Sequence, residues 1–120
     1  MESFNIFGSV EKKIEKINAL AEKKKVDPIL KFATGKDAAL RAAAAKALGT
    51  ISVDESYNQL VIMTRDPEVS VRKAAVLALG EIGRKAGADH VRHVMANETD
   101  AELIKICQTA ISKIVNSDVR

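Results

Sequence analysis

The sequence predicts an all-helical protein built from a short repeated unit, and three observations support this prediction. Apolar residues recur at helical spacing along most of the chain, and the strict alternation typical of a half-buried strand is not sustained anywhere. Prolines occur only at Pro28 and Pro67 in the 120 residues. The stretch VRKAAVLALGEIG, residues 71–83, resembles the earlier stretch LRAAAAKALGTI, residues 40–51, which lies about one helical pair upstream.

The first expected element is an amphipathic helix over residues 9–24. On a helical wheel Lys12, Lys16 and Lys23 fall on one face. The opposite face carries the apolar residues Val10, Ile14, Ile17 and Ala21. We therefore expect this helix to cap one end of the fold, with its lysines facing solvent.

Six further helices are expected over residues 28–34, 37–50, 54–64, 67–85, 88–96 and 100–116. Two Asp-Pro pairs, at Pro28 and Pro67, place a helix-capping acceptor before a proline that suits the first helical position. The runs SVDE (52–55) and TDAE (99–102) have capping-box spacing. Gly35 and Gly87 suit the turns between helices.

These helices group into one domain, 1–120, in which a capping helix (9–24) precedes three helical pairs at 26–51, 52–86 and 87–116. The second helix of the middle pair has its inward residues at Val71, Ala75, Ala78, Leu79 and Ile82. In the third pair the equivalent places are taken by Leu103, Cys107, Ala110, Ile111 and Ile114. A pair of this size cannot bury its apolar face alone, so the pairs must stack into a solenoid. The alanines let neighbouring helix axes approach closely, and a larger residue at Ala75 or Ala78 is expected to overpack the stack.

The stretch DPEVSVRKAAVLALGEIG, residues 66–83, is similar to the HEAT repeat, in the short form named after phycobilisome lyase subunits. The run from Lys36 to Ile51 is a second copy without the Asp-Pro pair. The run from Thr99 to Ile114 is a degenerate third, with Ile104 in place of the arginine and Ser112 in place of the glycine. The resemblance covers roughly residues 26–116. It implies a right-handed α-solenoid whose second helices line a concave face and whose members mostly bind other macromolecules.

Charge, cysteine content and hydropathy narrow the class of protein. The net charge of +3 arises from 19 basic and 16 acidic residues that are well mixed, which is not an obvious nucleic-acid footprint. Cys107 is the only cysteine, so an intrachain disulfide is excluded, and its inward position predicts a buried thiol. No apolar run has the roughly 20 residues needed to span a bilayer. We expect a cytoplasmic protein that does not enter the membrane.

Enzymatic and metal-binding motifs are weak. His90 and His93 are close enough on a helix to approach one ion, but Asp89 is expected to cap that helix, so no metal site is predicted. Deoxyhypusine hydroxylase resembles this chain in architecture and holds iron through His-Glu pairs, a dipeptide that this sequence lacks. Nucleophile-elbow, P-loop and dinucleotide-binding patterns are also missing. We expect a protein without catalytic activity or cofactor.

Two repeated features have structural interpretations. Arg41 and Arg72 occupy the same position in successive units, and in similar repeats this arginine bonds to an aspartate or a backbone group of a neighbouring unit. A structural ladder is therefore predicted. The lysines of the first helix are flanked by glutamates that dilute their field, which favours a solvated face, and phosphate binding stays open as an alternative.

The expected concave ridge offers the best candidate for a binding surface. It is expected to expose Val69, Lys73, Val76, Leu77, Gly80 and Arg84, with Ala42, Lys46, Lys105 and Thr109 from neighbouring units. We predict a protein scaffold or adaptor that binds an acidic, partly apolar segment through Lys46, Lys73, Leu77, Arg84 and Lys105. The alternatives are nucleic-acid binding through the N-terminal lysines, or service as an accessory subunit of a tetrapyrrole lyase-like enzyme. The partner and the oligomeric state do not follow from these patterns.

Overall fold

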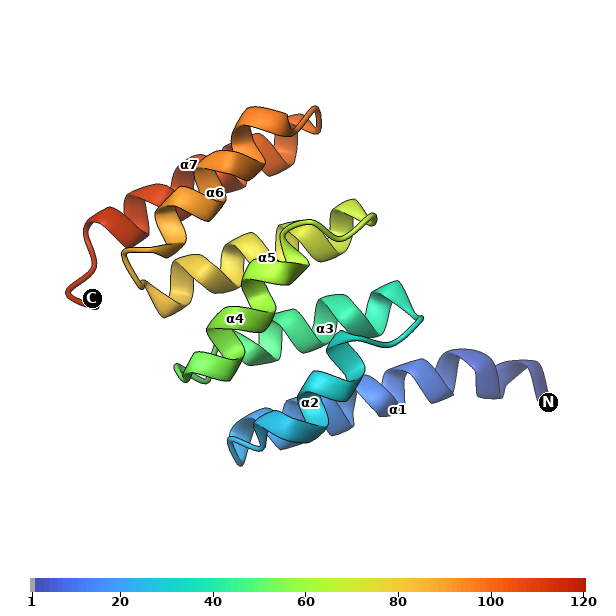
Figure 1. Cartoon of the computed structure of the whole chain (residues 1–120). Coiled ribbons are helices and arrows are strands. Elements are labelled where there is room, and N and C mark those ends of the chain that lie inside the picture. Colours follow the sequence, from blue (N-terminus) through green and yellow to red (C-terminus); the bar gives the residue numbers. More distant parts are fainter. Residues whose placement is uncertain (1) are drawn as a thin grey trace.

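A computed structural model describes residues 2–120, with side chains described from Ser9 onward. These residues form seven helices joined by short turns (Figure 1). The helices are α1 (Glu2–Glu22), α2 (Val26–Ala33), α3 (Ala38–Leu48), α4 (Asp54–Met63), α5 (Val69–Ile82), α6 (Gly87–Asn97) and α7 (Ala101–Val115). The prediction of an all-helical chain is confirmed over this part of the protein.

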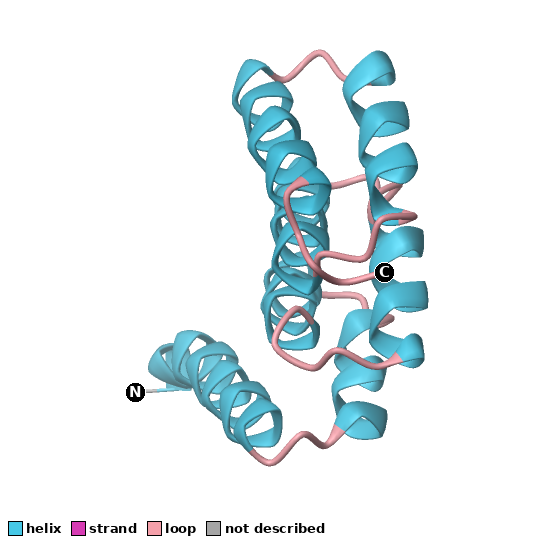
Figure 2. Ribbon diagram, turned by 90° about the vertical axis from the view of Figure 1, so that its left-hand side faces the viewer, coloured by secondary structure: helices cyan, strands magenta, loops and turns pink. Residues whose placement is uncertain are grey.

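The helices after α1 are arranged in two layers (Figure 2). One layer contains α3, α5 and α7, and α5 packs against both of the others. The other layer contains α2, α4 and α6, each packed against the helix that follows it in the chain. Helix α1 covers the end of the stack against α2 and α3 and is tilted away from the two layers. The arrangement is the expected α-solenoid of stacked helical pairs.

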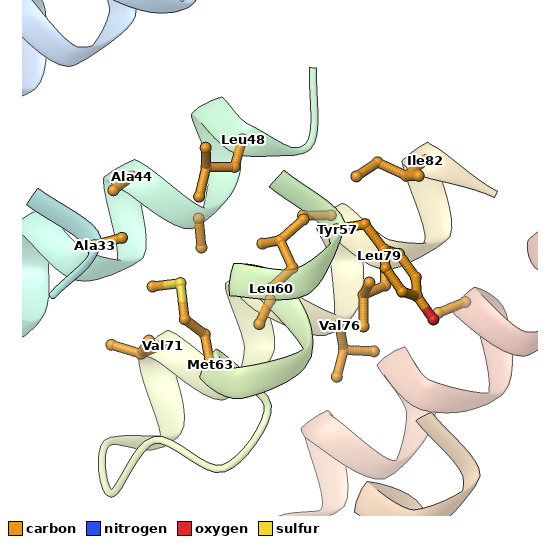
Figure 3. Close-up of a cluster of buried hydrophobic side chains, with 14 of the residues drawn as sticks. Ala33, Ala44, Leu48, Tyr57, Leu60, Met63, Val71, Val76, Leu79 and Ile82 are labelled. Carbon is orange, nitrogen blue, oxygen red and sulfur yellow. The ribbon is translucent and has the colours of Figure 1, made fainter. Parts of the chain in front are cut away.

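The core runs as one layer of apolar side chains between the two helical layers. Figure 3 shows its central part, where side chains of α3, α4 and α5 meet. All five inward residues predicted for α5 are buried, namely Val71, Ala75, Ala78, Leu79 and Ile82. On α1, Ile17 is fully buried and Val10, Ile14 and Ala21 pack partly against the core. The helical spacing read from the sequence therefore identified these buried residues.

Several helix boundaries differ from the predictions. Helix α1 begins at Glu2 rather than at residue 9. Helix α2 begins at Val26, so Pro28 lies inside the first turn, where a missing N–H is still tolerated. Helix α5 begins at Val69, because Asp66 and Pro67 form a turn in which the Asp66 carboxylate accepts a hydrogen bond from the Glu68 N–H at 2.9 Å.

Both predicted capping boxes are wrong in detail. The residue before α4 is Val53, which has no side-chain acceptor, and the residue before α7 is Asp100, whose carboxylate accepts from the Leu103 N–H at 2.9 Å. Helix α5 ends at Ile82, earlier than expected, because Gly83 adopts a left-handed conformation with φ of 76°. Gly87 is not a turn residue but the first residue of α6.

Small residues set the separation of the helices in the layer of α3, α5 and α7. A Cβ built on Gly49 would lie 2.7 Å from the Ala78 Cβ and 3.0 Å from the Ala78 Cα. One unit later, a Cβ on Gly80 would lie 3.3 Å from both the Cα and the Cβ of Ala110. The same glycine-on-alanine contact thus joins α3 to α5 and α5 to α7. These contacts explain the alanine-rich inward face.

Candidate partner-binding groove

An arginine ladder fixes how successive helical pairs sit on one another. The Arg41 Nε and Nη2 atoms donate to the two carboxylate oxygens of Asp66 at 2.9 and 3.0 Å, and its Nη1 donates to the carbonyls of Gly35 and Lys36. A guanidinium matches this planar carboxylate geometry in a way that an ammonium does not.

The contact repeats one unit later with Arg72. Its Nε and Nη2 donate to the Glu98 carboxylate at 3.0 and 3.2 Å, and its Nη1 donates to the carbonyls of Asp66 and Pro67. The pKa of Glu98 is lowered, chiefly because Arg72 hydrogen-bonds its carboxylate. The predicted structural ladder is confirmed, and both arginines are committed to holding the stack rather than to a ligand.

An open groove of about 870 Å³ runs between α3 and α5, and no residue of α2, α4 or α6 lines it. Its floor is made of small residues, Ala42, Ala43, Gly49, Ala74 and Ala78. The groove exists because these residues lack side chains long enough to fill the space between the two helices. Leu77 stands at its rim with 48% of its surface exposed. The fold therefore places a hollow apolar surface beside an exposed leucine.

Two charged residues also line this groove, and they differ in their partners. Glu81 of α5 forms an ion pair with Lys113 of α7. Lys46 of α3 is exposed and pairs with no carboxylate among the side chains described from Ser9 onward. The groove therefore carries one unbalanced positive charge, at Lys46.

Lys73, one of the predicted ridge residues, is engaged within the protein. Its ammonium pairs with Glu102 and lies 3.7 Å from the Asp100 carboxylate, both at the start of α7. The hydrogen bond to Glu102 is the main cause of the raised pKa of Lys73. Lys73 consequently links α5 to α7 and is not available as an isolated cation.

The structure separates the other predicted ridge residues. Arg84 lies past the end of α5, where its Nη2 donates to Asp54 at 2.7 Å and its guanidinium sits 5.0 Å from the centre of the Tyr57 ring of α4. Lys105 is exposed on α7 and does not line the α3–α5 groove. Of the five predicted binding residues, the groove brings together Lys46 and Leu77 only.

Two further ridge predictions are wrong. Val76 is fully buried rather than exposed, and Gly80 is buried against Ala110. Gly80 faces Ala110 of α7, and Val76 belongs to the core, because neighbouring helices and not solvent cover these sides of α5. A helical wheel with a single core stripe puts Val76 and Gly80 on the far side, whereas α3, α4 and α7 all pack against α5.

A second, smaller groove lies on the other side of α3. It has a volume of about 420 Å³ and is lined by Asn18, Ala21, Glu22 and Lys24 from the C-terminal part of α1 and the turn that follows. Lys46, Ala47 and Thr50 complete it. Lys46 and Thr50 therefore line both grooves, which adjoin across the C-terminal half of α3.

The remaining candidate groups show no arrangement suited to chemistry. Within the described residues no three His, Cys, Asp or Glu side chains come together as metal ligands. His90 packs edge-on against Tyr57, and the His93 carbonyl accepts a hydrogen bond from Asn97. Cys107 is fully buried, and burial raises the pKa of its thiol to about 11, which keeps the sulfur protonated.

Comparison with known proteins bears directly on this repeated architecture. A family profile described as HEAT repeats matches residues 17–112. The chain belongs to the HEAT-repeat family. HEAT repeats are commonly protein-interaction scaffolds and are typically not catalytic. No curated protein matches the chain. Among the described residues of this HEAT-repeat protein, no helix is both long and apolar enough to cross a membrane.

The groove itself was only partly predictable. Leu77 was found because it departs from the core stripe, and Lys46 because it occupies the equivalent position one unit earlier. Glu81 and its partner Lys113 were missed, as was the role of Thr50. The sequence feature that indicates a groove is the run of alanines on the flanks of α3 and α5. The sequence analysis attributes these alanines to helix packing alone.

Proposed function

We propose that this HEAT-repeat protein is a non-enzymatic adaptor that binds a segment of a partner protein in the groove between α3 and α5. The observation that carries the proposal is the combination of a floor of small residues with an exposed Leu77 at its rim. Burying apolar surface is the main source of affinity in most protein associations, and a leucine beside an unfilled hollow offers such surface.

The charge of the groove supports a partner segment with acidic character. Glu81 is neutralised by Lys113, and Lys73 is neutralised by the acidic residues that begin α7. Lys46 is left to attract a carboxylate from outside. An exposed pair of this kind adds specificity and speeds association more than it adds affinity.

A capture experiment with two matched variants tests the proposal. Leu77→Asp places a charge at the groove, whereas Ile62→Asp makes the same change at an exposed position of α4, which belongs to the other layer. Both side chains are exposed, at 48% and 65%, so neither variant should unfold the protein, and thermal melting checks this. We expect Leu77→Asp to lose a specific partner that both the wild type and Ile62→Asp retain from lysate.

Lys46→Glu is the second variant of choice. Lys73→Glu is less suitable, because it would bring a third carboxylate beside Asp100 and Glu102 and weaken the contact between α5 and α7. Equal recovery of every partner by the wild type and by both groove variants would contradict the proposal. Recovery of nucleic acid alone, reduced by substitution of the lysines of α1, would favour the alternative role of that helix.

A further inference from the structure

The backbone adopts a left-handed conformation at two of the described residues, and one of them is not a glycine. Gly83, after α5, has φ of 76°, and Lys24, after α1, has φ of 57°. The Lys24 N–H donates to the Ala21 carbonyl at 3.0 Å, and the next N–H, of Lys25, donates to the Leu20 carbonyl at 2.9 Å. A helix end with these two bonds usually takes glycine at this place, because the Cβ of any other residue crowds the backbone. Lys24 is therefore kept at a loss of stability.

The positive charge at the end of α1 does not by itself account for this lysine. A cation near the C-terminus of a helix interacts favourably with the helix dipole. Lys23 and Lys25 flank Lys24 and supply such cations without a left-handed backbone. Lys24 differs from both because it lines the groove of about 420 Å³ between α1 and α3, and they do not. Strained backbone conformations cluster at sites that hold ligands, so this position points to a binding role.

Three charged side chains line this groove, and none has an oppositely charged partner among the side chains described from Ser9 onward. Lys24 and Lys46 are exposed cations, and Glu22, the last residue of α1, is an exposed carboxylate. Two lysines and one glutamate give the groove a net charge of +1. The surrounding residues 9–46 contain ten basic and five acidic residues, a net charge of +5. Despite Glu22, the groove therefore attracts anions.

The composition of the groove favours an acidic polypeptide over a nucleic acid. Its lining residues include no aromatic ring on which a base could stack. The carboxylate of Glu22 opposes a strand that carries a phosphate on every nucleotide, whereas a polypeptide can place an acidic residue beside each lysine and a neutral one beside Glu22. The amide of Asn18 and the hydroxyl of Thr50 also line the groove and suit the polar groups of a peptide.

We propose that the α1–α3 groove binds an acidic segment of a partner protein, and that Lys24 is retained in its left-handed conformation to recognise this segment together with Lys46. Glu22 repels the same carboxylates, so the affinity is set by the balance between the two lysines and Glu22. The inference goes beyond the proposed function, because Lys24 does not line the α3–α5 groove and Leu77 does not line this one. Lys46 and Thr50 line both grooves, which makes the second site continuous with the first.

Lys24→Gly tests the proposal with two readouts that move in opposite directions. Glycine relieves the left-handed conformation, so we expect the melting temperature to rise by about 2–4 °C while binding of an acidic peptide weakens. Lys23→Gly is the matched control, because it removes the same charge from a neighbouring residue that has no left-handed backbone and does not line the groove. It should not raise the melting temperature and should leave binding nearly unchanged. Lys24→Arg keeps the charge and should retain binding.

Titration of the ¹⁵N-labelled protein with hexaglutamate at low ionic strength locates the site by NMR. We expect the largest chemical-shift changes at residues 18–24 and 46–50, and smaller changes at the lysines elsewhere in α1 and α2. The Kd for hexaglutamate should rise about two- to fivefold in Lys24→Gly and in Lys46→Gln, as is usual for the loss of one exposed charge pair. It should fall by a similar factor in Glu22→Gln, because that variant removes the carboxylate of the groove.

Several results would overturn the inference. These are shift changes spread evenly over all lysines, the absence of any shift change, hexaglutamate binding that is unaffected by Lys24→Gly, and an unchanged or lower melting temperature of that variant. Tighter binding of a thymidine hexanucleotide at the same residues would identify a nucleic acid as the occupant and overturn the acidic protein segment. The proposed function fails on a different result, a partner that Leu77→Asp still captures, so the two failures are distinguishable.

Discussion

Replacing Gly49 by alanine tests the packing that creates both the stack and the groove. Gly49 follows α3 with φ of −62° and ψ of −17°, a conformation that alanine adopts without strain. The added Cβ would nevertheless lie 2.7 Å from the Ala78 Cβ and 3.0 Å from its Cα. Because the second atom belongs to the backbone of α5, the contact cannot be relieved by rotating a side chain.

The magnitude follows from two opposing effects. Overpacking of this kind is expected to destabilise the protein by about 1–3 kcal/mol. Replacing glycine by alanine in a compatible conformation contributes about 0.4–1 kcal/mol in the other direction, through the unfolded state. Gly35→Ala is the matched control, because its new Cβ would meet only the Phe32 and Lys31 carbonyls, at 3.5 and 3.6 Å. The difference between the two variants isolates the contact with α5.

Urea unfolding of the wild type, Gly49→Ala, Gly35→Ala and the double variant Gly49→Ala with Ala78→Gly measures this difference. We expect Gly49→Ala to be about 1–3 kcal/mol less stable than Gly35→Ala, with part of the loss recovered in the double variant. Gly49→Ala as stable as the control would refute the idea that helix separation in this layer is set by contacts between glycine and alanine.

Three other predictions concern the ladder and the buried thiol. Arg72→Lys is expected to lose about 2 kcal/mol of stability, because lysine cannot donate to both Glu98 oxygens and to two carbonyls at once, and denaturant unfolding equal to that of the wild type would be inconsistent with the ladder. Acid should destabilise the protein. Burial raises the pKa of Asp66, but the hydrogen bond from Arg41 opposes this effect and the net pKa is lowered. The pKa of Glu98 is also lowered, chiefly by its hydrogen bond with Arg72. The stabilisation by these carboxylates is complete above the pKa values of about 4 that they have in the unfolded protein, and it is lost as the pH falls through their lower pKa values in the folded protein. The urea concentration at the unfolding midpoint should therefore decrease below about pH 4.5, and it should decrease less steeply in Glu98→Gln. Cys107, with a pKa of about 11, should react with a thiol reagent at pH 8 only after unfolding, and fast labelling of the native protein would contradict its burial.

The sequence predicted which residues are buried better than it predicted how the helices are capped. Inward residues of α5 such as Val71 and Leu79 could be assigned because a helical period places them on one stripe. The ends of α4, α6 and α7 lie within one residue of the prediction, whereas both ends of α5 were misplaced. The capping groups were harder to assign, since Asp66 caps a turn before α5 rather than the helix itself, and Val53 precedes α4 without any capping side chain. Local motifs state which groups can cap, whereas the tertiary contacts decide which of them do.

The binding surface was the least predictable part. A single helical wheel places Val76 and Gly80 on the outside, yet Val76 is fully buried in the core and Gly80 packs against Ala110 of α7. Lys73 looked like a free cation until the start of α7 supplied its two acidic neighbours. Assigning this surface requires the positions of three helices at once. The repeat boundaries 26–51, 52–86 and 87–116 stay predictions.

Hydrogen–deuterium exchange of the wild-type protein, with and without the partner recovered by capture, tests the central claim most directly. The account predicts slower exchange on binding in the C-terminal half of α3 and in α5 around Leu77, with no change in α4 around Ile62. Protection confined to the layer of α2, α4 and α6, or to the N-terminal part of α1, would contradict the assignment of the α3–α5 groove as the binding site.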